Sequence, residues 1–127
     1  MKIFGIGTDI VEVSRIKKSI KNKSFITRVY GKEEIIKCNK TFNSFNCYAK
    51  RFAAKEAFSK ALGTGVSKGI NFNEIIVLNE KNGKPFIKLL DKTKKNVKKK
   101  LKKKNYKISL SLSDEKKFAV AFVTISI

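Results

Sequence analysis

The chain has 127 residues, 42% of them hydrophobic, which is enough for one domain with its own core. Thirty Lys and Arg against ten Asp and Glu give a formal charge of +20, which attracts polyanions, although a lysine excess can equally form plain solvated surface. The absence of histidine excludes imidazole triads, and the two cysteines, Cys38 and Cys47, are interpreted as intracellular thiols rather than a disulfide framework.

Residues 2–13, KIFGIGTDIVEV, predict a buried first strand, because Ile, Val, Phe and Thr dominate and apolar side chains fall on both faces. Gly5 and Gly7 in this strand indicate that another backbone segment approaches closely. Only Lys2 precedes the apolar run and Asp9 interrupts it, so we expect neither a signal peptide nor a membrane span. We therefore expect a cytoplasmic protein.

Short helices are expected after this strand. In residues 13–20 the apolar side chains recur at spacings of three and four, which is typical of a helix with one buried face. KSFITRVY (23–30) and GKEEIIKC (31–38) predict two more helical segments, which separate at Gly31. The longest helical pattern covers residues 43–62 and is followed by glycine, a common helix terminator.

The C-terminal half predicts four strands and one further helix. FNEIIVLN (72–79) and PFIKLL (85–90) form an expected hairpin, because EKNGKP between them contains the Asn and Gly of a tight turn. DKTKKNVKKKLKKKN (91–105) predicts a marginal and largely exposed helix. YKISLSLS (106–113) and KFAVAFVTISI (117–127) predict a closing antiparallel hairpin. These elements indicate a compact α+β domain, an antiparallel sheet packed against one long helix and short helices.

One stripe of the long helix carries both core residues and charges, namely Phe45, Ala49, Phe52, Glu56 and Lys60. Glu56, and Asp9 in the first strand, are therefore both expected to be partly buried, and a buried carboxylate needs a cation. Two interpretations stay open. One is a salt bridge, for Glu56 with Lys60 one helical turn later, and the other is a hard metal ion shared by the two carboxylates.

The surroundings of Glu56 point to phosphate chemistry. Arg51 and Lys55 lie in the same helix, and the glycine-containing residues 63–65 (GTG) at its end offer bare backbone amides to phosphate oxygens. Magnesium commonly binds through one or two carboxylates together with substrate phosphates. Neither GIGTD nor GTG has the spacing of a dinucleotide-binding fold or a P-loop, which excludes those two phosphate sites.

The sequence resembles the holo-[acyl-carrier-protein] synthase family of bacterial phosphopantetheinyl transferases in four segments: GIGTDIVEVSRI, RFAAKEAFSKALGTG, GKP and SLSDEKKFAVAFV. The match is collinear over essentially the whole chain, which implies a single phosphopantetheinyl transferase domain over residues 1–127. The resemblance implies transfer of the 4'-phosphopantetheine group from coenzyme A to a serine of apo acyl carrier protein for fatty acid biosynthesis, with release of 3',5'-ADP. It also implies Mg2+ as the cofactor and a homotrimer with coenzyme A sites between subunits.

The same resemblance assigns roles to individual residues. Asp9 and Glu56 correspond to the family's magnesium ligands, and Lys60 corresponds to a lysine close to the pyrophosphate, so these three are the expected catalytic residues. Arg15 corresponds to an arginine near the surface that docks the carrier protein. The residues expected to bind coenzyme A or to border it are Arg51, Lys55, Gly63, Thr64, Gly65, Lys84 and Pro85.

The chain departs from the family pattern near its C-terminus. Several family members have histidines where this chain has Ser109 and Asp114, so the identity of the general base stays open. A rival interpretation is a basic nucleic-acid-binding protein, based on the lysine-rich run at residues 92–107. This run contains one aromatic residue, Tyr106, and no recognisable reading helix, so sequence-specific nucleic-acid binding is not expected. No membrane partner is expected either. A purely structural basic protein would leave the inward carboxylates unexplained.

Overall fold

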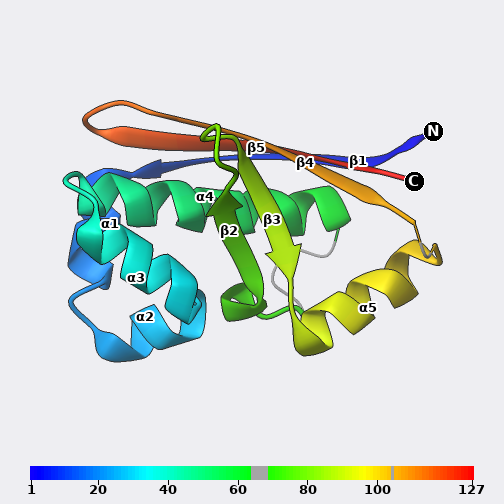
Figure 1. The fold of residues 1–127 in the computed structure, drawn as a ribbon, viewed down its shortest axis with the longest axis horizontal. Coiled ribbons are helices and arrows are strands. Elements are labelled where there is room, and N and C mark those ends of the chain that lie inside the picture. The colour runs from blue at the N-terminus through cyan, green and yellow to red at the C-terminus, as the bar shows by residue number, and fades with distance from the viewer. Residues whose placement is uncertain (64–68, 104) are drawn as a thin grey trace.

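The structure, a computed structural model that describes residues 1–63, 69–103 and 105–127, is built around helix α4, Ser44–Leu62 (Figure 1). The elements before it are β1, Ile3–Glu12, and the helices α1, Val13–Ser19, α2, Lys23–Val29, and α3, Lys32–Lys40. The elements after it are a 3-10 turn η1, Phe72–Glu74, the strands β2, Ile75–Asn79, and β3, Pro85–Leu89, helix α5, Asp91–Leu101, and the strands β4, Lys107–Asp114, and β5, Phe118–Ser126.

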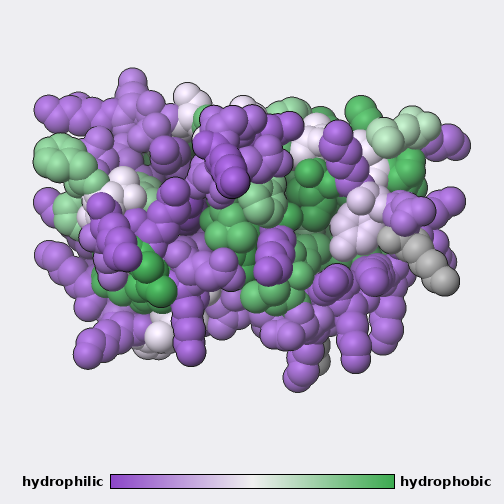
Figure 2. Space-filling view, viewed as in Figure 1, coloured by the Kyte–Doolittle hydropathy of each residue, from purple (hydrophilic) through white to green (hydrophobic). Residues whose placement is uncertain are grey.

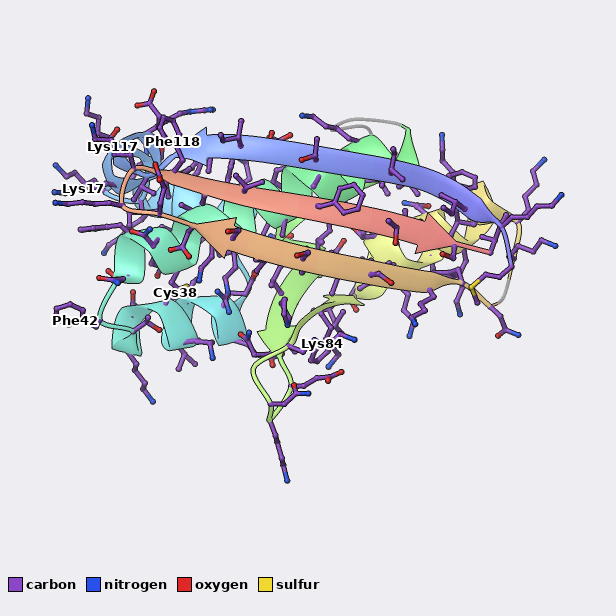
Figure 3. All side chains as sticks on the ribbon, turned by 90° about the horizontal axis from the view of Figure 1, so that it is seen from above. Lys17, Cys38, Phe42, Lys84, Lys117 and Phe118 are labelled. Atoms are coloured by element: carbon purple, nitrogen blue, oxygen red, sulfur yellow. A yellow bond between two sulfur atoms is a disulfide. The ribbon has the colours of Figure 1, made fainter. Side chains whose placement is uncertain are left out.

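Two antiparallel sheets enclose α4. The larger sheet has the strand order β1-β5-β4, and its strands lie side by side along one face of the helix (Figures 1 and 3). Strands β2 and β3 form a separate hairpin that crosses one side of α4 and contacts β4 at the edge of the larger sheet, with α1, α2 and α3 toward one end of α4 and α5 toward the other (Figure 1). The predicted α+β class and the two predicted hairpins are confirmed, and the hairpin of β2 and β3 does not join the larger sheet.

Helix α4 is buried around most of its circumference. Thirteen of its 19 residues are buried, whereas Phe45 and Lys60 on the predicted inner stripe are exposed. The expectation of one core-facing stripe was wrong, because the larger sheet covers one side of the helix and the hairpin and short helices cover the other. Glu56 consequently lies at the edge of the buried surface and is half-buried.

The glycines of β1 allow this strand to lie unusually close to α4. A Cβ atom at Gly5 would overlap the carbonyl oxygen of Ala61, and one at Gly7 would overlap the carbonyl oxygen of Ala57. The predicted close backbone approach is therefore confirmed, and its partner is the last turns of α4. This contact brings Asp9, two residues further along β1, to the side of the helix that carries Glu56 and Lys60.

The outer face of the larger sheet is exposed, contrary to the expectation that β1 is buried on both faces. Ile6 and Ile10 of β1 are 60% and 64% exposed, and Phe122 of β5 is 44% exposed. Figure 3, which looks onto this face, shows the three strands with no helix of the described chain in front of them. The apolar residues of β1 therefore form two faces, of which only one belongs to the core of a single chain.

The two cysteines form a disulfide that joins α3 to the first turns of α4, with a Cα separation of 5.4 Å between Cys38 and Cys47. Their interpretation as unpaired thiols was wrong, because residues nine apart in sequence meet where the chain reverses between two helices.

Helix α5 contacts the rest of the molecule through one narrow face. Thr93, Val97 and Leu101 are buried, while the lysines between them are exposed. Hydrophilic residues cover most of the face in Figure 2, and apolar residues gather at its centre. The helix ends at Leu101, before the predicted boundary at residue 105. No helix in the described ranges combines the length and the apolar character needed to cross a membrane.

Candidate active site

Asp9 and Lys60 form the centre of the site on the β1 side of α4. The Nζ atom of Lys60 lies 3.3 Å from Oδ1 of Asp9 and donates a hydrogen bond to the carbonyl oxygen of Thr8 at 2.9 Å. The Asp9 side chain is 17% exposed and that of Lys60 is 54% exposed, so the pair is reachable from solvent. The salt bridge expected between Lys60 and Glu56 is replaced by this cross-element contact, which the sequence spacing did not reveal.

Glu56 lies close enough to this pair to interact with it electrostatically. Burial raises the pKa of the Glu56 carboxyl, the negative charge of Asp9 raises this pKa further, and Lys60 and Arg15 act in the opposite direction. Burial also raises the pKa of Asp9, while its hydrogen bond to Lys60 and the charges of Lys60 and Arg15 lower it. Two carboxylates and two cations therefore share one half-buried region.

The chemistry of these donors fits a magnesium ion. Asp9 and Glu56 offer hard carboxylate oxygens, and each raised pKa indicates a carboxylate whose negative charge is only partly compensated by its neighbours. Within the part of the chain that the structure describes, no group of three or more acidic or cysteine side chains gathers around one point. A metal held here would thus have few protein ligands, which is the common pattern for magnesium that also binds substrate phosphates.

Arg15 projects from α1 toward the same region. Its guanidinium carbon lies 5.7 Å from the centre of the Phe52 ring, and its charge acts on both Asp9 and Glu56. The side chain is exposed.

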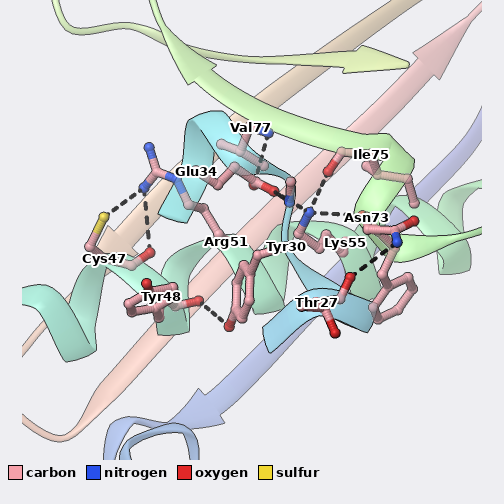
Figure 4. A network of polar contacts seen from close by, with 12 residues as sticks. Thr27, Tyr30, Glu34, Cys47, Tyr48, Arg51, Lys55, Asn73, Ile75 and Val77 are labelled. Atoms are coloured by element: carbon pink, nitrogen blue, oxygen red, sulfur yellow. Dashed lines mark hydrogen bonds and ion pairs between the residues drawn. The ribbon is translucent and has the colours of Figure 1, made fainter. Parts of the chain in front are cut away.

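Arg51 lies on a different side of α4, in a pocket lined by residues of the α3–α4 connection, α4, the β2–β3 turn and β4, here called the Arg51 pocket. Its Nη2 atom donates to Oδ1 of Asn79 at 3.2 Å. Its Nη1 atom contacts the Cys47 sulfur at 3.2 Å and the Cys47 carbonyl oxygen at 3.4 Å (Figure 4). The residue is 3% exposed, and its Nε atom has no hydrogen-bond partner among the residues that the structure describes. Burial lowers the pKa of this guanidinium.

The GKP turn joins the Arg51 pocket through Asn79, whose Nδ2 atom donates to the Gly83 carbonyl oxygen at 3.0 Å. Gly83 has a φ of +90°, a conformation that glycine adopts without strain. Lys84 is exposed just before β3 (Figure 3), and Pro85 opens β3. The structure thus brings together Arg51 and the GKP turn, two segments that the resemblance placed near the nucleotide.

The expected site residues fall into two groups on opposite sides of α4. Arg51 and Lys60 are nine residues apart, which is about two and a half helical turns, so their side chains leave the helix in opposite directions. The first group, on the β1 side, contains Asp9, Glu56 and Lys60. The second group, in the Arg51 pocket, contains Arg51 and the GKP turn. Within one chain the two groups do not meet.

Lys55 belongs to neither group. Its Nζ atom lies 2.7 Å from Oε1 of Glu34, and it donates to the carbonyl oxygens of Phe72 and Ile75 (Figure 4). Burial lowers the pKa of Lys55 to about 8, and the Glu34 carboxylate acts in the opposite direction. Because both side chains of the pair have no exposed surface, Lys55 is not placed to contact a bound nucleotide, and that expectation is corrected to a structural role.

Glu34 is the buried charge that the sequence reasoning missed. It also accepts hydrogen bonds from the backbone N–H groups of Gly31, at 3.0 Å, and Val77, at 3.1 Å. One signal was present in the sequence, since a glutamate three residues after the residue that precedes a helix often bonds back to that residue's N–H. No local pattern indicated that its partner would be a lysine of α4.

Five further positions named in the sequence analysis are Gly63, Thr64, Gly65, Ser109 and Asp114. Gly63 ends α4 with a φ of +84°, while Thr64 and Gly65 lie outside the described residues. Ser109 is exposed on β4. Asp114 accepts a hydrogen bond from Asn46 at 2.9 Å and lies 3.6 Å from the Lys50 ammonium at the rim of the Arg51 pocket.

The fold and these two groups of residues can be compared with known proteins. The sequence model of the 4'-phosphopantetheinyl transferase superfamily matches residues 5–123, which include β1, α4 and the GKP turn. The holo-[acyl-carrier-protein] synthase of Pelagibacter ubique (strain HTCC1062) is 54% identical over 125 residues, which cover 98% of each of the two chains.

Solved structures agree with this assignment. The crystal structure of holo-[acyl-carrier-protein] synthase from Neisseria meningitidis has a TM-score of 0.88 at 36% identity and covers 98% of this chain and 99% of its own. The enzyme from Bacillus anthracis str. Ames, in complex with CoA (3',5'-ADP), has a TM-score of 0.81 at 35% identity and covers 99% of this chain and 98% of its own. The chain therefore belongs to the holo-[acyl-carrier-protein] synthase family of the 4'-phosphopantetheinyl transferase superfamily.

Proposed function

We propose that this chain transfers the 4'-phosphopantetheine group of coenzyme A to a serine hydroxyl of apo acyl carrier protein and releases 3',5'-ADP. The observation that carries the proposal is the convergence of Asp9, Glu56 and Lys60 where β1 meets α4, in a chain that belongs to the holo-[acyl-carrier-protein] synthase family. In this reaction the serine oxygen attacks the phosphorus that bears the pantetheine arm. The bond from this phosphorus to the bridging oxygen breaks, and that oxygen leaves with 3',5'-ADP.

Asp9 and Glu56 would hold a magnesium ion through their carboxylate oxygens. When bound, the ion supplies positive charge to the pyrophosphate and to the oxygen that leaves. The side chain of Lys60 is more than half exposed beside Asp9, and its ammonium would offer a second positive charge to the same phosphates. Both carboxylates are held by regular elements, β1 and α4, which fixes their separation.

Arg51 and the GKP turn would bind the nucleotide part of coenzyme A. The buried guanidinium with an unpartnered Nε atom supports this role, because a buried donor without a partner is costly unless a ligand satisfies it. The exposed lysines that line the pocket, Lys37 and Lys81, add positive potential for a ligand that carries several phosphates.

A homotrimer with each active site between two subunits is the assembly that we propose. It is supported by the placement of the two groups on opposite sides of α4, since the Asp9 group of one subunit can meet the Arg51 pocket of another but not its own. It is also supported by the exposed apolar face of the larger sheet, which includes Ile6, Ile10 and Phe122. We further propose that the protein works in the cytoplasm, where coenzyme A and carrier proteins for fatty acid synthesis would meet it.

The direct test is a transfer assay with apo acyl carrier protein, coenzyme A and Mg2+, read as the mass gain of one phosphopantetheine group on the carrier. We expect transfer that disappears when Mg2+ is chelated and returns when it is restored. Absence of transfer with several apo carrier proteins, by a folded protein that binds coenzyme A, would contradict the proposal.

A second candidate function rests on the exposed lysines of α5, which favour a polyanion such as nucleic acid. Competition separates the two functions. Coenzyme A binding that depends on Mg2+ and is not displaced by duplex DNA at moderate salt supports the transferase alone, whereas DNA binding that survives moderate salt would support the second function.

A further inference from the structure

One sulfur of the Cys38–Cys47 disulfide, that of Cys47, contacts the guanidinium of Arg51 directly. The Cys47 sulfur lies 3.2 Å from Nη1 of Arg51, and Figure 4 shows the sulfur and the Cys47 carbonyl oxygen facing the same guanidinium. The other sulfur belongs to Cys38 of α3, and the connection between α3 and α4 supplies Thr41 and Phe42 to the pocket wall. The disulfide therefore holds in place both the Cys47 sulfur that contacts Arg51 and the α3–α4 connection that lines the pocket.

We propose that Cys38 and Cys47 form a reversible redox-modification site whose oxidation state sets how well the Arg51 guanidinium binds an anionic ligand. In the disulfide form the Cys47 sulfur is uncharged, so Arg51 keeps its full positive charge for a phosphate. In the dithiol form the same sulfur can ionise, because a cysteine beside an arginine loses its proton more readily than a free cysteine. A thiolate at this position would pair with Arg51 and compete with the ligand.

The two cysteines differ in their position relative to the Arg51 pocket, which defines the order of the exchange. Cys47 is 5% exposed and lines this pocket, whereas Cys38 is 0% exposed and does not line it. A small thiolate entering the pocket would attack the Cys47 sulfur, the bond between the two sulfurs would break, and Cys38 would leave and take up a proton. A second thiol then attacks the mixed disulfide and releases Cys47, so two thiols become one disulfide while the protein gains two thiols.

This proposal rests on the proposed function in one respect, namely that the anionic ligand of Arg51 is the nucleotide part of coenzyme A. In a reducing cytoplasm the dithiol form is the expected ground state, and disulfides there are commonly transient and sense oxidation. The pair would then raise the affinity for coenzyme A under oxidising conditions, when thiol–disulfide exchange closes the bond.

The experiment compares the oxidised and the dithiothreitol-reduced protein, with the redox state checked by alkylation and mass measurement. Titration with coenzyme A and with adenosine 3',5'-bisphosphate should give a Kd about tenfold weaker for the reduced form, the size expected for weakening one charge-assisted contact. Reoxidation with glutathione disulfide should restore the original Kd. Equal Kd values in both forms, or thiols that stay open to alkylation in the folded protein after oxidation, would overturn the proposal.

Two single substitutions separate the charge effect from the loss of the cross-link. Cys38→Ser leaves the Cys47 thiol beside Arg51 without a disulfide, and we expect it to bind as weakly as the reduced parent under both conditions. Cys47→Ala removes the competing sulfur as well, so it should bind more tightly than Cys38→Ser and show no redox response. Equal affinities of these two variants would assign the effect to the cross-link and contradict competition by the thiolate.

A measurement without coenzyme A keeps this proposal distinct from the proposed function. The reaction of reduced Cys47 with iodoacetamide near neutral pH should slow when Arg51 is replaced by Gln, because the positive charge that favours the thiolate is lost. If neither redox form binds coenzyme A, the proposed function fails. The alkylation rates then still test the pairing of Cys47 with Arg51, and equal rates in the parent and Arg51→Gln would refute it.

Discussion

The Nζ atom of Lys60 lies 3.3 Å from Oδ1 of Asp9, the carboxylate that we propose as a magnesium ligand. A cation at this distance competes with a metal for the same oxygen. Lys60→Met should therefore strengthen Mg2+ binding in the absence of coenzyme A while it slows transfer, because the lysine's charge is also lost from the pyrophosphate. Calorimetric Mg2+ titration and the transfer assay measure the two effects. Weaker Mg2+ binding by the variant would show that the two cations do not compete for Asp9.

Removing either carboxylate charge should abolish magnesium-dependent transfer without unfolding the protein. Asp9→Asn and Glu56→Gln preserve the size of each side chain, and both groups are only partly buried, so the fold has little reason to change. Glu33→Gln, on an exposed glutamate of α3, is the matched control and should keep the parent rate. Thermal unfolding checks the fold. Transfer at the parent rate by Asp9→Asn or Glu56→Gln would remove that residue from the metal site.

The close contact between β1 and α4 predicts very different costs for two glycine substitutions. Gly7→Ala should lower the free energy of unfolding by about 3 kcal/mol or more, because the added methyl group overlaps the Ala57 carbonyl oxygen and pushes the strand from the helix. Gly83→Ala is the comparison, since nothing lies within 4 Å of its added carbon and only its positive φ is strained, which costs about 1–2 kcal/mol. Urea denaturation of both variants tests this order, and equal losses would contradict it.

The buried pair of Glu34 and Lys55 should behave as one unit in a double-mutant cycle. Glu34→Gln or Lys55→Met alone leaves an uncompensated buried charge, which should cost about 3–5 kcal/mol of stability. The double variant should be more stable than the sum of the two losses predicts, by about 1–3 kcal/mol. Additive losses in chemical denaturation would mean that the two charges do not stabilise each other.

Helix α5 should tolerate the loss of lysines on its exposed face. Replacing Lys95 and Lys99 by Gln removes a like-charged pair four residues apart, so the free energy of unfolding should rise by a few tenths of a kcal/mol, roughly. The KM values for coenzyme A and carrier protein should stay unchanged. Arg15→Gln is the contrasting variant and should raise the KM for carrier protein. A raised carrier KM for the α5 variant would identify this helix as a docking surface.

The secondary structure was largely predictable because it depends on local patterns. The spacing of apolar residues located α1, α4 and both hairpins. Gly5 and Gly7 predicted a close backbone contact of β1, which the structure shows with α4. The burial of individual residues was less predictable. The apolar pattern of β1 is the same whether another layer of the chain covers its outer face or that face is exposed. The disulfide between Cys38 and Cys47 depends on how two helices meet, which no short window of sequence describes.

The candidate site was located by resemblance more than by periodicity. The pattern placed Glu56 near the core, but the contact between Asp9 and Lys60 joins residues far apart in sequence. Lys55 was misassigned because neighbours in a helix point about 100° apart, so residues adjacent in a motif can serve the core and the site separately. The buried role of Glu34 was missed because its partner, Lys55, lies on another helix, α4, far from it in the sequence.

The burial of Lys55 also makes this residue a natural reporter of unfolding. Among the lysines in the described ranges it is the one whose side chain is buried, and all the others are at least partly open to solvent. An amine-acylating reagent would therefore modify the surface lysines of the native protein quickly and reach Lys55 only during transient opening of the core. The slow appearance of acylated Lys55 in a mass spectrum would then give the opening rate or the opening equilibrium without any added denaturant.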